Sequence, residues 1–151
     1  MYEPSAYAGG VASDDHVRAV RALSRAARLL EHASGDLTLA QYRVLSAVAG
    51  GDARASRIAQ RLALGKPAVS NAVDALCQRG LLDRADSDDQ RVVLLHLTAA
   101  GRRQLNAVER DMSRWLDGVL TRTEDPDGVL QALVAFGDGI EALHAERAAA
   151  R

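Results

Sequence analysis

Apolar residues recur at intervals of three and four positions in six segments of the chain, and this spacing predicts helices. The predicted helices cover residues 14–33, 39–49, 55–62, 67–79, 99–120 and 126–143. One stretch has a different pattern. Leu81-Leu82 and the β-branched, apolar run from Val92 to Leu97 predict two short strands around a charged tip, Asp86 to Arg91. The chain is therefore expected to be mainly α, with a small β-hairpin wing.

Residues at the predicted helix starts support these boundaries. Ser13 precedes the first helix and Thr98 precedes the fifth, where a hydroxyl can accept a hydrogen bond from a free backbone N–H group. Thr38 and Gln41 have the spacing of a capping box at the start of the second helix. Pro67 suits the first turn of the fourth helix, where its missing N–H costs nothing.

The order of these elements predicts a winged helix-turn-helix flanked by dimerisation helices. Residues 1–12 are expected to form a flexible tail, 13–36 a dimerisation helix, 37–98 the winged helix-turn-helix and 99–151 the C-terminal dimerisation helices. The outer helices have apolar stripes that a single copy would leave exposed, so a homodimer is the simplest way to bury them. The alternative is a single monomeric core built from all six helices.

The distribution of charge says more than the formal net charge of −1. Between Asp52 and Arg103 there are nine basic and six acidic residues, against ten basic and fourteen acidic residues elsewhere. The segment with the predicted helix-turn-helix is thus +3 and the remainder −4. A basic middle suits a surface that faces phosphates.

The composition argues against several other classes of protein. No apolar run approaches the roughly 20 residues that span a bilayer, and the start does not resemble a signal peptide, so a cytoplasmic location without membrane contact is expected. The single cysteine, Cys77, excludes an intrachain disulfide, and an inert role is favoured over a redox one. The histidines have no metal-ligand spacing, so neither a metal nor a cofactor is expected. They are His16, His32, His96 and His144.

The predicted fourth helix has an outward face of small and polar residues that fits a major groove about 12 Å wide. These residues are Ala68, Ser70, Asn71, Asp74, Ala75 and Gln78. Ser70 and Asn71 lie near the helix start, where recognition helices meet base edges, and Asn can form two hydrogen bonds with adenine. The alternative is an ordinary solvated helix face.

The wing tip is too acidic to bind DNA through bulk charge, so a local interaction is predicted. Asp89 can hold Arg91 in an extended pose, from which Arg91 can enter a narrow minor groove. Arg84, at the base of the hairpin, is either a phosphate contact or a partner for one of the aspartates. Further phosphate candidates, which position the protein without reading sequence, are Arg54, Arg57, Lys66 and Arg79.

An ordered set of segments resembles the MarR family of bacterial transcription regulators. The segments are Leu37–Leu45, Ile58–Leu62, Val69–Leu76, Gly80–Arg84, and Asp89–Arg91 leading to Leu97–Gly101. The resemblance implies a homodimeric winged-helix repressor or activator that binds double-stranded DNA at a near-palindromic operator. Two departures remove an arginine: Ser70-Asn71 replaces the Thr-Arg of many members, and Asp89-Gln90-Arg91 replaces Asp-Arg-Arg.

The resemblance also implies a cleft for a small ligand, often aromatic and anionic, between the dimer helices and the DNA-binding part. Candidate ligand contacts are Tyr42, Arg43, Met112 and Trp115, with plain core packing as the alternative. Arg43 is predicted to be partly buried and could pair with an anion. The expected function is a repressor released by a ligand. The rivals are a winged-helix module for protein contacts without specific DNA binding, and a small enzyme, for which no catalytic motif stands out.

Overall fold

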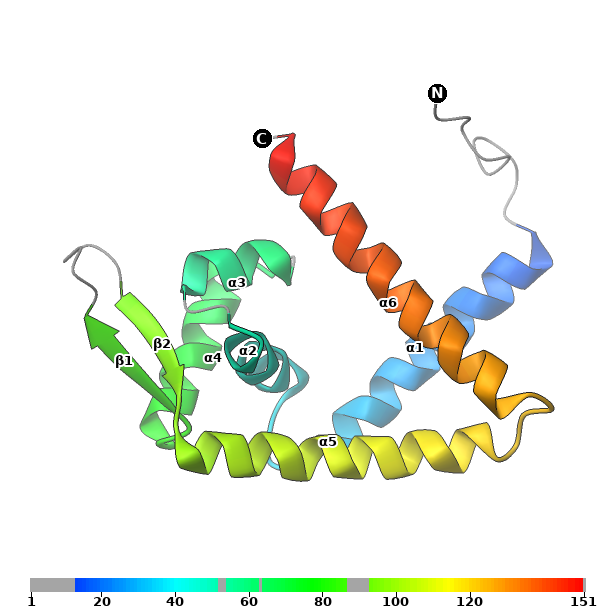
Figure 1. Cartoon of the computed structure of the whole chain (residues 1–151), viewed down its shortest axis with the longest axis horizontal. Helices are drawn as coiled ribbons and strands as arrows, with labels where there is room; N and C mark the ends of the chain where they lie inside the picture. The colour runs from blue at the N-terminus through cyan, green and yellow to red at the C-terminus, as the bar shows by residue number, and fades with distance from the viewer. Residues whose placement is uncertain (1–12, 52–53, 63, 87–92, 151) are drawn as a thin grey trace.

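The computed structural model describes residues 13–51, 54–62, 64–86 and 93–150, and over these residues the chain forms six helices and two strands (Figure 1). The elements, in order, are α1 (Asp14–Ala33), α2 (Leu39–Ala49), α3 (Ala55–Arg61), α4 (Lys66–Gln78), β1 (Leu82–Asp86), β2 (Val93–Leu97), α5 (Ala99–Leu120) and α6 (Pro126–Ala149). The mainly helical architecture with a small hairpin is the one predicted from the sequence.

The helices α2, α3 and α4 and the hairpin form one compact unit, here called the lobe (Figure 1). Its centre consists of side chains with less than 2% of their surface exposed. They include Val44, Leu45, Ile58, Val69, Leu76 and Leu82. Helix α5 closes the same core with Leu105, Val108 and Met112, so the lobe core is closed within a single chain.

The helix caps are those expected from the sequence. The Ser13 hydroxyl accepts from the backbone N–H of His16, and Thr38 and Gln41 form the full capping box. The boundaries of the fourth helix shift by one residue from the prediction. Helix α4 begins at Lys66, because Gly65 already has the extended conformation of an N-cap residue, and it ends at Gln78.

The hairpin is antiparallel, with Leu82 opposite Leu97 and Asp86 opposite Val93. Two details of the predicted strand were wrong. Leu81 lies before β1, and Asp86 belongs to the strand and not to the tip. The cause is a turn at Gly80, whose φ of 66° is left-handed and which delays the start of the strand. The tip residues Asp89 and Arg91 lie outside the described residues.

A tight joint connects the hairpin to α5. The Thr98 hydroxyl donates to the carbonyl of Gly80 at 2.8 Å and accepts from the backbone N–H of Gly101 at 2.9 Å. A Cβ atom at Gly101 would lie 2.0 Å from the carbonyl oxygen of Leu81, so only glycine permits this approach. Because one threonine bonds to both sides of the joint, the start of α5 is fixed relative to the hairpin.

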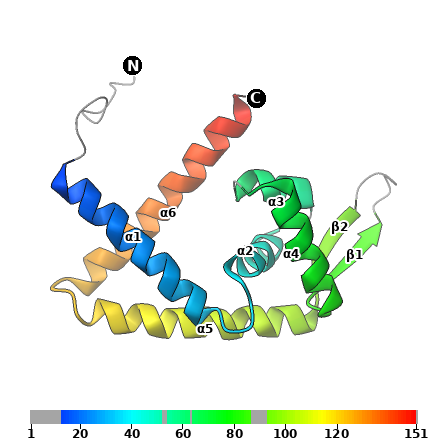
Figure 2. The same ribbon diagram turned by 180° about the vertical axis from the view of Figure 1, so that it is seen from behind.

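The remaining helices form an extended arm outside the lobe. Helix α5 runs away from the lobe, α6 turns back, and α1 packs against α5 (Figure 1, Figure 2). On α6, apolar side chains are between 36% and 60% exposed. They are Val129, Leu130, Leu133, Val134, Phe136, Ile140 and Leu143. The predicted alternative of one monomeric core does not match this arrangement, since one copy leaves these residues uncovered.

Candidate nucleic-acid interface

Helix α4 has one buried and one exposed face, and the exposed face is the predicted reading surface. Val69, Ala72, Val73 and Leu76 are buried in the lobe core. The exposed residues are Ala68, Ser70, Asn71, Asp74 and Gln78. Ala75 was also predicted to point outward, but it is half-buried, because it lies at the edge where α4 meets the rest of the lobe. The exposed surface is therefore small and polar, as a helix needs to be to enter a major groove.

The predicted phosphate contacts occupy exposed positions around this helix. Arg54 is extended immediately before α3, Arg57 lies on α3, and Lys66 is the first residue of α4. Arg79 is also exposed, but its guanidinium donates to the backbone carbonyl of Asp36 at 2.9 Å. Arg79 thus holds the segment before α2 against the end of α4.

An ion pair joins α4 to the wing. The guanidinium of Arg84, on β1, donates to the Asp74 carboxylate, and this hydrogen bond raises the pKa of Arg84. Of the two roles predicted for Arg84, the structure favours an aspartate partner. The partner, Asp74, belongs to helix α4 and not to the wing, which sequence spacing did not indicate.

A second ion pair, between residues 80 positions apart, was missed by sequence reasoning. Arg61, at the end of α3, bonds through Nε and Nη2 to the two carboxylate oxygens of Glu141 on α6, at 3.1 and 3.4 Å. This contact links the lobe to the arm at the point where α6 returns toward α3 (Figure 1).

Cys77 is half-buried near the end of α4, beside the Asp74–Arg84 pair. Burial raises the pKa of its thiol, and the nearby Arg84 opposes this rise only in part. A raised pKa disfavours the thiolate, which is the reactive form, so it is in line with the predicted inert role.

The predicted ligand contacts lie on two helices that pack together, Tyr42 and Arg43 on α2 and Met112 and Trp115 on α5. Tyr42 and Trp115 are half-buried and Met112 is buried. Burial raises the pKa of the Tyr42 phenol, the charge of Glu109 adds to the effect, and a hydrogen bond with Ser46 opposes it. The prediction that Arg43 is partly buried was wrong. It is exposed, because it lies on the side of α2 opposite the core residues Val44 and Leu45.

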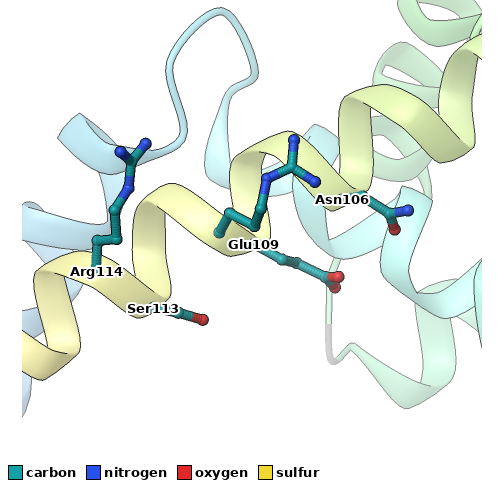
Figure 3. A pocket seen from close by; sticks show the side chains of 5 residues that line it. Asn106, Glu109, Ser113 and Arg114 are labelled. Atoms are coloured by element: carbon teal, nitrogen blue, oxygen red, sulfur yellow. The ribbon is translucent and has the colours of Figure 1, made fainter.

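An open hollow of about 650 Å³ lies along α5. It is lined by Asn106, Glu109, Arg110, Ser113 and Arg114, and by none of the four predicted ligand contacts. The lining side chains do not converge on one point, since Arg114 points to one side of α5 and Glu109 and Ser113 to the other (Figure 3). The hollow is a polar surface on one helix and not an enclosed binding pocket.

The described residues contain no group of three or more His, Cys, Asp or Glu side chains arranged to hold a metal ion. None of the helices within that part of the chain combines the length and apolar character needed to cross a bilayer.

Comparison with known proteins shows which family and which solved structures this arrangement resembles. Residues 35–91, which include α2, α3, α4 and β1, match the sequence profile of the MarR family. This match covers the segment with the helix-turn-helix, and solved structures that include MarR from E. coli resemble the chain in fold. No curated protein matches the chain.

Solved structures share the fold over most of the chain. Wild-type MarR from E. coli, in its apo form, superposes with a TM-score of 0.69 at 22% identity, over 84% of this chain and 97% of that one. The regulator BldR from Sulfolobus solfataricus gives 0.68 at 19% identity, over 85% and 99%. PcaV from Streptomyces coelicolor, solved with its natural ligand, gives 0.64 at 25% identity, over 87% and 97%. The likeness extends beyond the lobe into the arm.

Proposed function

We propose that this protein is a homodimeric, sequence-specific DNA-binding repressor that a small ligand releases from its operator. The observation that carries the proposal is the exposed polar face of α4. Asp74 on this face forms an ion pair with Arg84 of the adjacent wing. In a winged helix-turn-helix, these two elements meet the major groove and the flanking DNA.

The arm supplies the argument for a dimer. Val129, Leu133, Phe136, Ile140 and Leu143 follow one another at alternating intervals of four and three residues, so they form one apolar seam along α6. An exposed seam of this length is unfavourable in water, and a second copy can cover it. A two-fold dimer would present two recognition helices to successive major grooves, which matches a near-palindromic operator.

The proposed release by a ligand rests on the packing of α2 of the lobe against α5, with Tyr42 on α2 and Met112 on α5 both packed in the core. A ligand at this junction can bind one lobe-to-arm geometry better than another and so couple its binding to DNA affinity. Arg43, exposed on α2, is placed to attract an anion from solvent. The relative PcaV was solved with a natural ligand, which supports ligand binding as a property to test.

The protein-contact module remains the second candidate, because the formal net charge is −1 and the wing strand β1 carries Asp83 and Asp86. The two candidates differ in how DNA binding depends on sequence and salt. A regulator prefers a selected operator over random duplexes, and its affinity falls steeply as salt rises. A protein-contact module would bind every duplex weakly and alike.

The test begins by selecting duplexes from a random library with the purified protein. The affinities of the selected and scrambled duplexes are then measured by fluorescence anisotropy over a salt series. Asn71→Ala is expected to relax base preference at one operator position by about fivefold or more. Gln131→Ala on α6 is the control and should bind as the parent does. Equal binding of selected and scrambled duplexes would overturn the proposal.

Release is tested with a panel of substituted benzoates, which are small aromatic anions. A functional effector should weaken binding of the selected duplex, and Arg43→Ala should raise the concentration needed. If the parent and Arg43→Ala respond alike to an active benzoate, Arg43 is not a ligand contact. If no benzoate changes DNA binding, the proposed class of effector is wrong.

A further inference from the structure

The Asp74–Arg84 ion pair joins the two elements that meet DNA in the function proposed above. Arg84 Nη2 donates to Asp74 Oδ1, while the Asp74 and Arg84 side chains remain 52% and 48% exposed. Arg84 lies in the middle of β1, opposite Leu95 of β2, so the strand pair fixes its backbone. The ion pair therefore lies on the outer surface of the lobe, and the paired strands hold the backbone of Arg84.

Asp74 occupies the middle of the exposed face of α4. Ser70 lies one turn before it and Gln78 one turn after it, and Asn71 is three residues away on the same face. Within the described residues, Asp74 Oδ1 is the carboxylate oxygen that holds Arg84, and Oδ2 has no hydrogen-bond donor. One acceptor atom on the reading surface is thus left available.

A carboxylate on a surface that faces DNA is unfavourable unless its charge is balanced, because the phosphates repel it. The guanidinium of Arg84 supplies that balance and restricts the Asp74 side chain to one orientation. The pair engages an Nη2 donor of Arg84 and balances its charge against a carboxylate, so its attraction for a phosphate is weaker than that of an unpaired arginine. The geometry thus argues against the phosphate contact that the sequence alone allowed for Arg84.

The donor that suits Asp74 Oδ2 is the exocyclic amino group of cytosine. In the major groove cytosine presents only its N4 amino donor, whereas adenine presents the acceptor N7 beside its N6 amino group, and N7 would repel a carboxylate. We propose that Asp74 reads a cytosine through Oδ2 and that Arg84 is the positioning residue that holds it for this contact. This inference rests on the proposed function.

The experiment measures base preference and salt dependence together. Duplexes selected by the parent protein, and variants carrying every single base-pair substitution, are titrated with the parent, Asp74→Ala, Arg84→Ala and the double variant. Both single variants should lose at least about fivefold of the preference for cytosine, at the same position of each half-site. In the Asp74→Ala background, Arg84→Ala should cause no further loss of preference.

Two more variants separate positioning from charge. Arg84→Lys keeps the positive charge and can still pair with Asp74, so it should restore most of the cytosine preference. Arg28→Ala removes an exposed arginine from α1, a helix outside the lobe, and should leave the preference unchanged. Circular dichroism and thermal melting of each variant verify that the lobe is folded. If Arg84→Ala does not fold, Arg84→Gln replaces it in the same cycle.

Three other results would contradict the inference, and each has a different cause. If Arg84→Ala weakens all duplexes by the same factor, with and without Asp74, and lowers the salt slope by about one, Arg84 is a phosphate contact and the inference is wrong. If Asp74→Ala changes preference at no position, Asp74 does not read a base. If the parent protein itself selects no sequence, the proposed function fails, and the inference fails with it.

Discussion

The lobe and the arm use apolar residues in opposite ways. In the lobe, Leu45, Ile58 and Leu76 have none of their surface exposed, and the core is closed by the same chain. On α6 of the arm, Phe136 is 52% exposed and Ile140 41%. The two regions thus contain similar residues in similar helices, but only the lobe is complete in one copy.

Because of this difference, the two regions should depend in different ways on a second copy of the chain. The lobe can hold its reading surface without a partner, because its core depends on contacts within the chain. In the proposed dimer, the arm buries its seam against a second copy, so its stability is expected to depend on protein concentration. A protein that reads DNA as a dimer needs both properties, and the lobe-to-arm contacts decide how one affects the other.

The largest effect is expected from charges in the seam. Leu133→Asp combined with Ile140→Asp should weaken dimer formation by at least about 100-fold, because two apolar contacts are lost and two carboxylates would be buried. Sedimentation velocity over a dilution series measures the change. Gln131→Asp, on the opposite side of α6, should leave the dimer intact. A double variant that remains dimeric like the parent would disprove the role given to the seam.

A substitution that creates a cavity in the lobe core should lower the stability of the fold. Leu45→Ala should reduce the free energy of unfolding by roughly 2–5 kcal/mol, since the side chain is fully buried. Urea denaturation monitored by circular dichroism measures this loss. The same change at Leu29, which is 43% exposed on α1, should have a much smaller effect. Equal losses for the two leucines would mean that the lobe core is not as closed as described.

A substitution at Thr98, in the joint between the hairpin and α5, should have a smaller effect on stability. Thr98→Ala removes the cap of α5 and the bond to the Gly80 carbonyl, and should lower the unfolding free energy by about 1 kcal/mol. Thr98→Ser keeps the hydroxyl and should recover most of the loss. If serine destabilises as much as alanine, the hydroxyl bonds are not the cause.

The smallest effect is expected at the contact between α3 and α6. Glu141→Gln weakens the ion pair with Arg61. The Arg61 side chain is 41% exposed and that of Glu141 is 56% exposed, so the loss of unfolding free energy should stay below about 1 kcal/mol. Thermal melting at low and high salt measures it, and the difference should shrink at high salt. A loss that persists in high salt would indicate a role beyond charge pairing.

The elements of the fold could be predicted from the sequence because their signals are local. The apolar spacing located each helix, and Ser13, Thr38 and Thr98 marked starts that the structure confirms. The same local signals placed Ser70 and Asn71 on the exposed face of α4. Their contact with DNA stays a prediction.

The tertiary pairs could not be predicted, because they depend on how distant elements pack. Arg84 meets Asp74 only because β1 follows α4 through the turn at Gly80, and Arg61 meets Glu141 only because α6 returns toward α3. The exposure of Arg43 was missed for a related reason. Its neighbours Val44 and Leu45 fill the core, which leaves Arg43 on the outer side of α2.

The central claim is that two lobes joined by the arm read DNA sequence together. The most direct test compares, at physiological salt, the affinity of the parent protein for a selected inverted-repeat duplex and for a scrambled duplex of equal length. We expect one dimer to bind the inverted repeat at least about a thousandfold more tightly than the scrambled duplex. Equal affinity for the two duplexes, or binding of the repeat by a monomer, would contradict it.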